Sequence, residues 1–265
     1  MTTFFQSLDP VYVLCGVLVG GLVGITGVGG GSLMTPLLIL LFGIDPGKAV
    51  GTDLIYASIT KAGGSLVHGY NNTIDWKVVG RLALGSLPAT ALTVLLLYFL
   101  KIDSPTAKSL ITKVLGLAIL FTAASLLFRK QLMRWYDNRI GELPPKLVFR
   151  LTVLTGVVLG VLVTLSSVGA GAIGVVALVM LYPKMPARRI VGSDIAHAVP
   201  LTLVAGLGHW YYLNSINLSI LTSLLAGSIP AIIVMSLVAA RASDTAVRVA
   251  LAVVLLAVCI RFWFF

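Results

Sequence analysis

Apolar residues run along the chain in long blocks separated by short polar segments. The blocks cover residues 11–43, 47–69, 77–100, 109–128, 148–182, 187–213, 216–240 and 245–265. Most have the roughly 20–25 residues with which a helix crosses a hydrocarbon core of about 30 Å. Blocks 11–43 and 148–182 are too long for one crossing, and small residues interrupt each midway. We therefore predict an all-α, polytopic helical membrane protein in which each long block is a folded-back pair of helices.

The two halves of the chain repeat one another at a shift of about 140 residues. Gly51-Thr52-Asp53 falls on Gly192-Ser193-Asp194, and the Gly-Ser-x-Pro-Ala segment at 85–89 recurs at 227–231. Each half contains a folded-back or broken helix pair plus three transmembrane helices, and an odd number of crossings reverses the orientation of the second half. The prediction is two inverted-topology repeats, at 1–128 and 148–265, joined by a linker at 129–147.

Composition agrees with a lipid environment and changes how the charge is interpreted. Hydrophobic residues make up 58% of the chain, charged residues only 11%, and the mean hydropathy is +1.04. These values exclude a soluble enzyme and a nucleic-acid-binding module. The net charge of +10 is an orientation signal, because cytoplasmic loops collect Lys and Arg. The basic linker at 129–147 is therefore predicted to be cytoplasmic, in a multi-pass protein of the cell inner (cytoplasmic) membrane.

A Gly-rich break carries a family resemblance. The segment Gly27-Val28-Gly29-Gly30-Gly31-Ser32, followed by Gly51-Thr52-Asp53, resembles the TauE/SafE sulfite exporter family, also called the 4-toluene sulfonate uptake permease family. The resemblance covers nearly the whole chain and implies a membrane transporter, an exporter of small sulfur-containing anions such as sulfite. The second-half copy departs from the pattern, with Ala170 and Ala172 where the first half has Gly30 and Ser32.

The two breaks are candidate anion sites. A helix that starts inside the membrane presents unpaired N–H groups and a positive dipole end, and both favour an anion. The alternative is that these glycines only allow tight packing between helices. The predicted substrate-binding residues are Gly29, Gly30, Gly31 and Ser32 at the first break, Gly169, Ala170 and Gly171 at the second, and Thr52, Ser193 and Lys61 beyond them.

Asp53 and Asp194 are candidates for proton coupling or gating. Each lies about 11 Å into its helix from a nearby proline, where a carboxylate requires a cavity or a partner. In the alternative interpretation, Gly51 and Gly192 break these helices and the aspartates are N-caps. His197 lies one turn after Asp194, so it either joins a proton relay or packs in the core. Protons are thus a candidate coupling ion.

Lys61 and two further histidines complete the candidates. Lys61 lies in mid-segment, where the second half has Thr202. It attracts the anion or pairs with an acid in one interpretation, and snorkels to the membrane surface in the other. His68 and His209 each precede a tyrosine by two residues near a helix end, which predicts interfacial anchoring.

No catalytic or metal-binding motif stands out. The chain has no Gly-x-Ser-x-Gly elbow and its three histidines lack HExxH spacing, so we expect neither enzyme activity nor a metal or other cofactor. The expected partners are a small anion and the lipid bilayer. An inside-negative potential favours anion exit by about 2.3 kcal/mol per charge for each 100 mV, so export needs no coupled ion. The alternatives are a proton-coupled importer of organosulfonates or other small anions, and an anion channel.

Overall fold

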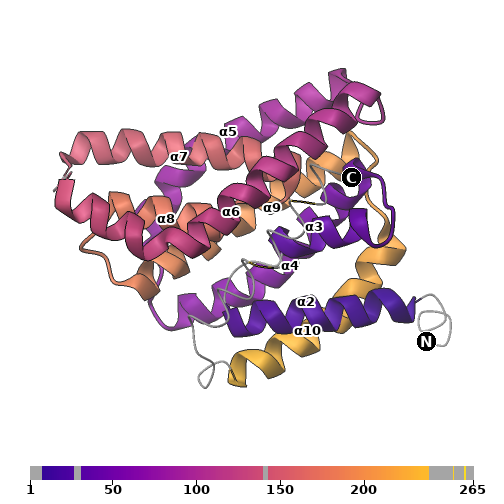
Figure 1. Cartoon of the computed structure of the whole chain (residues 1–265), viewed down its shortest axis with the longest axis horizontal. Helices are drawn as coiled ribbons and strands as arrows, with labels where there is room; N and C mark the ends of the chain where they lie inside the picture. The colour runs from indigo at the N-terminus through magenta and orange to yellow at the C-terminus, as the bar shows by residue number, and fades with distance from the viewer. Residues whose placement is uncertain (1–7, 27–30, 140–142, 239–252, 254–259, 261–265) are drawn as a thin grey trace.

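The computed structural model describes residues 8–26, 31–139, 143–238, 253 and 260 (Figure 1). Within these residues the chain forms helices joined by short turns, with no β-strand, so the all-α prediction is confirmed. The helices are α2 (Pro10–Thr26), α3 (Gly31–Leu40), α4 (Pro46–Tyr70), α5 (Trp76–Phe99), α6 (Pro105–Arg139), α7 (Pro145–Ser166), α8 (Ala172–Leu181), α9 (Ala187–Tyr211) and α10 (Leu218–Val238).

Five of these helices are long and apolar enough to cross a membrane: α5, the Pro105–Ser125 part of α6, α7, α9 and the Leu218–Met235 part of α10. Helix α4 has 25 residues, but buried polar and charged side chains lower its hydropathy. The last apolar block, 245–265, lies outside the described residues except for Val253 and Ile260. The polytopic helical architecture is therefore confirmed.

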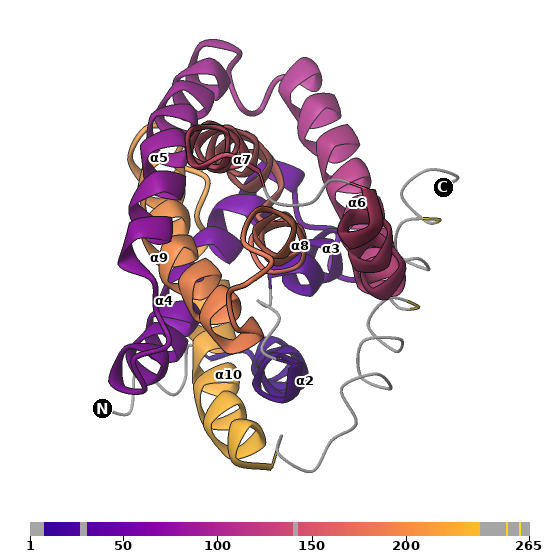
Figure 2. The same cartoon turned by 90° about the vertical axis from the view of Figure 1, so that its left-hand side faces the viewer.

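Each long apolar block contains two helices, as its midway small residues predict. Helix α2 ends at Thr26 and α3 begins at Gly31, while residues 27–30 lie outside the described part. The second break is described in full: Ser167 is left-handed, and Gly169 and Gly171 have φ values of 119° and 121°, which favour glycine. Figure 2 shows α7 and α8 end-on together, so their axes are nearly parallel.

The halves of the chain exchange helices, in the sense that a helix of each half packs along a helix of the other half. Helix α2 packs along α10, and α7 packs along α5, as both views show (Figures 1 and 2). The contacts are reciprocal: the Cα of Gly16 lies against the backbone carbonyl of Leu224, and that of Gly156 against the carbonyl of Leu82, with no room for a Cβ. Glycine at these positions therefore lets two pairs of helix backbones approach closely.

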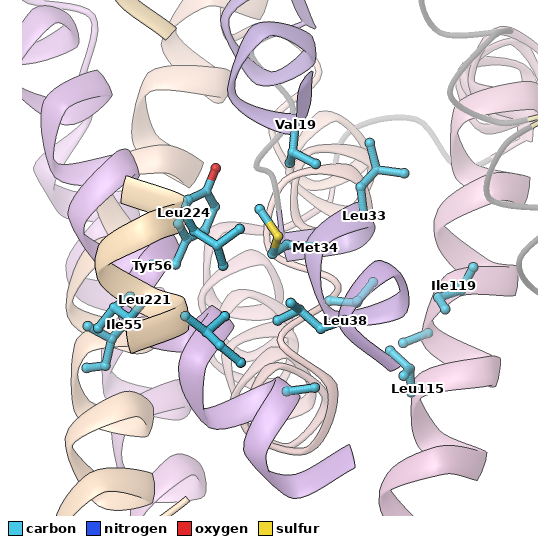
Figure 3. Close-up of a cluster of buried hydrophobic side chains, with 14 of the residues drawn as sticks. Val19, Leu33, Met34, Leu38, Ile55, Tyr56, Leu115, Ile119, Leu221 and Leu224 are labelled. Carbon is cyan, nitrogen blue, oxygen red and sulfur yellow. The ribbon is translucent and has the colours of Figure 1, made fainter. Parts of the chain in front are cut away.

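Helices α4 and α9 pack against each other with antiparallel axes. A Cβ on Gly206 of α9 would lie 2.5 Å from Ile55 of α4, and a Cβ on Gly64 of α4 would lie 3.6 Å from Ile195 of α9. Residue numbers thus rise along one helix as they fall along the other. An apolar cluster packs against one side of this pair. Its side chains come from α2, α3, α6 and α10 and include Met34, Leu115 and Leu224 (Figure 3).

The structure gives two helix ends that bear on the sequence-based expectations. Helix α6 continues to Arg139, so much of the predicted linker at 129–147 is helical. Helices α4 and α9 run without a break through Gly51 and Gly192, with their N-caps at Asp45 and Pro186. The interpretation of Asp53 and Asp194 as N-caps is therefore wrong, because backbone hydrogen bonds on both sides already hold them in helix interiors.

Candidate functional site

Asp53 and Asp194 occupy the same position in the two antiparallel helices. Each is the eighth residue of its helix, and they are 0% and 1% exposed. The Thr35 hydroxyl of α3 donates to Asp53 Oδ2 at 2.5 Å, whereas Asp53 Oδ1 has no hydrogen-bond partner among the described residues. The first carboxylate is therefore hydrogen-bonded to the middle of α3, the short helix in its own half.

Asp194 makes the corresponding approach in the second half. Its carboxylate faces the backbone of Gly171 and Gly174, at the beginning of α8. A Cβ on Gly174 would overlap Asp194 Oδ1, so only glycine leaves room for the carboxylate there. Within the described part of the chain neither oxygen of Asp194 has a hydrogen-bond partner. A buried, unpaired carboxylate at a helix N-terminus marks a place where a ligand or proton is expected.

Lys61 extends from α4 to the second break. It is 7% exposed, and its Nζ donates to the backbone carbonyl of Ala170 at 3.4 Å. The ammonium is also close enough to interact electrostatically with both Asp194 and Asp53, although it forms no salt bridge with either within the described residues. The snorkelling interpretation is wrong, because the charge ends inside the protein rather than at its surface. One buried cation thus interacts with two buried carboxylates.

A second layer of polar side chains lies one turn along each helix. His197 Nε2 is 2.8 Å from the Ser86 hydroxyl of α5, and its Nδ1 has no partner among the described residues. In the other half, the corresponding Tyr56 faces Ser228 of α10. Both pairs are buried; the first lies between α9 and α5, and the second lies between α4 and α10. The second half therefore has an imidazole where the first half has a phenol.

Thr52 and Ser193 connect the central helices to the turns that follow the opposite ones. Thr52 Oγ1 accepts from the Asn217 N–H at 3.1 Å, and Ser193 Oγ accepts from the Asp75 N–H at 2.8 Å. These reciprocal bonds fix where α10 and α5 begin. Both hydroxyls accept hydrogen bonds from backbone N–H groups of the protein, and their role in substrate binding stays a prediction.

The interfacial role predicted for His209 is wrong. Its ring is fully buried, with Nδ1 3.0 Å from the Ser215 hydroxyl and Nε2 3.1 Å from the Thr164 carbonyl. His68 is half-buried and contacts the Thr73 hydroxyl at 2.8 Å. Both histidines hold the turn that follows their helix. The repeat alignment contained this signal, since each histidine precedes a Thr or Ser by five or six residues.

A basic pocket of about 480 Å³ opens where α9 begins. Its lining includes His68, Asn72, Arg188 and Arg189, and Arg189 approaches Asp75 at 3.8 Å. The pocket lies less than two helical turns from Asp194 along α9. At the opposite end of the central pair, where α4 begins, Asp45 instead forms a 2.7 Å ion pair with Lys108. The two ends of the site therefore differ in charge.

Comparison with known proteins decides the family. The family described as "Sulfite exporter TauE/SafE" matches residues 12–262, nearly the whole chain. The chain belongs to the TauE/SafE family. It is accordingly a multi-pass membrane transporter, as the resemblance at the Gly-rich break predicts.

Relatives of this TauE/SafE transporter have names that agree with the assignment. The probable membrane transporter protein YjnA of Bacillus subtilis is 39% identical over 92% of this chain and 95% of its own length. The probable membrane transporter protein MJ0441 of Methanocaldococcus jannaschii is 29% identical over 77% of this chain and 72% of its own. No solved structure matches the chain.

The TauE/SafE fold brings one group of the predicted residues together and leaves another undecided. Gly29 and Gly30 lie outside the described residues, Gly31 begins α3, and the Ser32 side chain is not described. The residues that meet at the centre are Asp53, Lys61, Ala170, Gly171, Asp194 and His197. Sequence reasoning missed Thr35 and Ser167; the latter lies at the break, close to Asp53. A single hydroxyl in an apolar block gives no signal by itself.

Proposed function

We propose that this TauE/SafE transporter exports a small sulfur-containing anion such as sulfite, and binds it beside Lys61 at the break between α7 and α8. The observation that carries the proposal is the buried Lys61 ammonium, which donates to the Ala170 carbonyl. That single 3.4 Å bond leaves two of its three protons for a ligand. A buried cation at membrane depth marks a substrate pathway.

The backbone at this break supports the same anion. Gly169 and Gly171 have positive φ angles, and α8 begins directly after them. The Gly174 N–H donates to the Gly169 carbonyl, so the N–H groups of Ala172 and Ile173 are the ones without an acceptor in the helix. Lys61 and these N–H groups together provide charge and hydrogen-bond donors for an oxyanion. The first break, with Gly29, Gly30, Gly31 and Ser32, is proposed as the equivalent half of the site.

Burial of the site supports a carrier that works by alternating access rather than an open channel. Lys61, Asp53 and Asp194 are all buried, so the site is closed in this conformation. The antiparallel α4 and α9 support inverted-topology repeats. Because the halves exchange helices, we propose that the moving units are not residues 1–128 and 148–265. They are the bundles built on α2 with α10 and on α5 with α7.

The proposed orientation follows the basic segments. We place the linker at 129–147 and the turns near Lys77, Lys184 and Arg188 on the cytoplasmic side of the cell membrane. The basic pocket at the start of α9 then opens to the cytoplasm, where an exported anion would enter. The ion-paired Asp45 and Lys108 lie at the outer end.

Reconstitution of the full chain in liposomes tests the proposal. Liposomes with the protein are expected to release at least one of sulfite, thiosulfate and sulfoacetate with saturable kinetics, faster than protein-free liposomes. Lys61→Gln is expected to lower the rate at least tenfold, whereas the matched control Lys113→Gln, at an exposed position on α6, leaves it unchanged. Ligand binding also raises the thermal midpoint in detergent. If none of these anions crosses or stabilises the protein, the proposal is wrong; equal rates for Lys61→Gln and wild type would remove Lys61 from the site.

A further inference from the structure

The buried charges at the centre limit what the site is able to bind. Asp53, Asp194 and Lys61 are buried together, and in fully ionised form they add to one net negative charge. The helix ends at the second break change this sum little, because the positive N-terminus of α8 lies beside the negative C-terminus of α7. An uncompensated charge at membrane depth is costly. The closed site is therefore most stable when its net charge is zero.

If the net charge of the site must be zero, the number of protons bound to its carboxyls differs between the empty site and the site with an anion. When the site is empty, one bound proton neutralises it, because Lys61 then balances a single ionised carboxylate. When a monovalent anion enters, a second proton is needed, so both carboxyls are protonated and Lys61 balances the anion. We propose, on the basis of the anion site proposed above, that this transporter carries monovalent oxyanions together with one proton each, in an electrically neutral step. Export by this route is driven by the outward gradient of the anion itself and not by the membrane potential, and an alkaline cytoplasm opposes it.

The contacts assign the two protons to different carboxyls. Lys61 Nζ contacts the Ala170 carbonyl, and Asp194 faces the backbone of the next residue, Gly171, so Asp194 is the carboxylate that Lys61 balances in the empty site. Asp53 is the carboxyl that Lys61 does not balance, so it holds the proton of the empty site; besides Lys61, the groups that face it are the uncharged hydroxyls of Thr35, Ser167 and Tyr56. When the anion binds, the Lys61 ammonium balances the anion and no longer balances Asp194. Asp194 then binds the transported proton.

His197 is the other titratable group that faces the lysine. Its Nε2 contacts the Ser86 hydroxyl at 2.8 Å, and the ring is buried close to the Lys61 ammonium. A second cation beside Lys61 would be repelled, so the imidazole enters the count as a neutral group. Testing His197 separately from the carboxyls therefore distinguishes the two possible proton carriers.

The requirement for zero net charge selects ligands by their own charge. A dianion in the same site leaves one negative charge uncompensated even when both carboxyls are protonated, because Lys61 is the one cation among the described residues there. Sulfonate monoanions and hydrogen sulfite satisfy the count, whereas the dianions sulfate, thiosulfate and sulfoacetate, which carries a carboxylate beside its sulfonate, do not. The proposed substrate class is thus narrower than sulfur-containing anions in general.

Methanesulfonate is the suitable probe, because it stays a monoanion and does not cross lipid as a neutral acid. In liposomes with wild-type protein, a gradient of one pH unit at zero membrane potential is expected to concentrate it about tenfold on the alkaline side, where the product of proton and anion concentrations becomes equal on both sides. A potassium diffusion potential at equal pH is expected to produce no accumulation. Sulfoacetate is expected to enter at least tenfold more slowly.

Variants assign the coupling to the carboxyls. Asp53→Asn with Asp194→Asn fixes both groups in neutral form, so this double variant is expected to carry methanesulfonate in response to potential and not to pH. Asp103→Asn, at an exposed position, is the matched control and keeps the wild-type response. Loss of pH-driven accumulation in His197→Gln, with the double variant still coupled, would overturn the assignment to carboxyls.

The wild-type measurement alone decides the proposal if the double variant fails to fold. Accumulation that follows the potential and ignores the pH gradient would overturn proton coupling while leaving the proposed transport of sulfur anions intact. Equal rates for sulfoacetate and methanesulfonate would overturn the selection for monoanions. Failure of methanesulfonate, sulfite, thiosulfate and sulfoacetate all to cross would overturn the proposed function itself, and this inference with it.

Discussion

Replacing Gly174 by alanine tests the contact between α8 and the carboxylate of Asp194. The added methyl group would overlap Asp194 Oδ1 and lie 3.1 Å from Asp194 Cγ, so the carboxylate must rotate away. Overpacking of this kind costs about 1–3 kcal/mol. The gain in helix propensity from Gly to Ala, about 1 kcal/mol, offsets part of that cost. Gly80→Ala has the same gain with no atom within 4 Å of the new methyl group.

The measurement is the difference between the two alanine variants in thermal unfolding in detergent. Gly174→Ala is expected to be less stable than Gly80→Ala by about 1–3 kcal/mol, at roughly 2–4 °C per kcal/mol for a protein of this size. In an Asp194→Ala background the difference should disappear, because the two residues no longer touch. Transport by Gly174→Ala should be slower than by Gly80→Ala. Equal midpoints for Gly174→Ala and Gly80→Ala, or a difference that persists without the carboxylate, would refute the proposed contact.

Other substitutions test the remaining contacts. Thr35→Val removes the donor to Asp53 and should lower the free energy of unfolding by about 1–3 kcal/mol. Thr35→Ser keeps the donor and should be close to wild type in the same thermal assay. A Thr35→Val variant as stable as Thr35→Ser would contradict this prediction. His209→Leu leaves the buried Thr164 carbonyl unsatisfied and removes one of the two hydrogen bonds of the Ser215 hydroxyl. It should destabilise the protein by about 1–3 kcal/mol without altering the affinity for anions. Arg188→Gln should raise KM for anions offered at the basic pocket about threefold to tenfold at low salt, and less at high salt, whereas Lys48→Gln should not.

Local sequence patterns predict the helices well because lipid imposes a simple rule on them. A helix in hydrocarbon must satisfy its own backbone, so long apolar blocks and their breaks at small residues mark α2, α3, α7 and α8 almost directly. The apolar pattern does not show where α6 ends, since this helix continues to Arg139, past the apolar block at 109–128. Hydropathy reports where the chain leaves lipid, and a helix of polar residues continues past that point.

The site was only partly predictable, because its contacts join distant segments. Asp53, Asp194 and Lys61 stood out as charges within apolar blocks. The proximity of Lys61 to Asp194 depends on α4 and α9 packing as antiparallel neighbours, which no local spacing shows. The role of Gly174 was equally hidden, since it depends on a carboxylate that approaches from another helix. The repeat alignment held more information than single motifs: Thr52 and Ser193 correspond in sequence, and they make equivalent hydrogen bonds.

The exchange of helices between halves has a consequence for how the protein is made. Helix α2 enters the membrane early in synthesis, but α10, the surface on which its glycines pack, is translated only near the end of the chain. Until then α2 must reside in lipid without its close-packed partner, and the first half has no complete bundle of its own. Residues 1–128 made alone should therefore be degraded, and co-expression with 148–265 as a separate chain should restore a stable transporter by assembly within the bilayer.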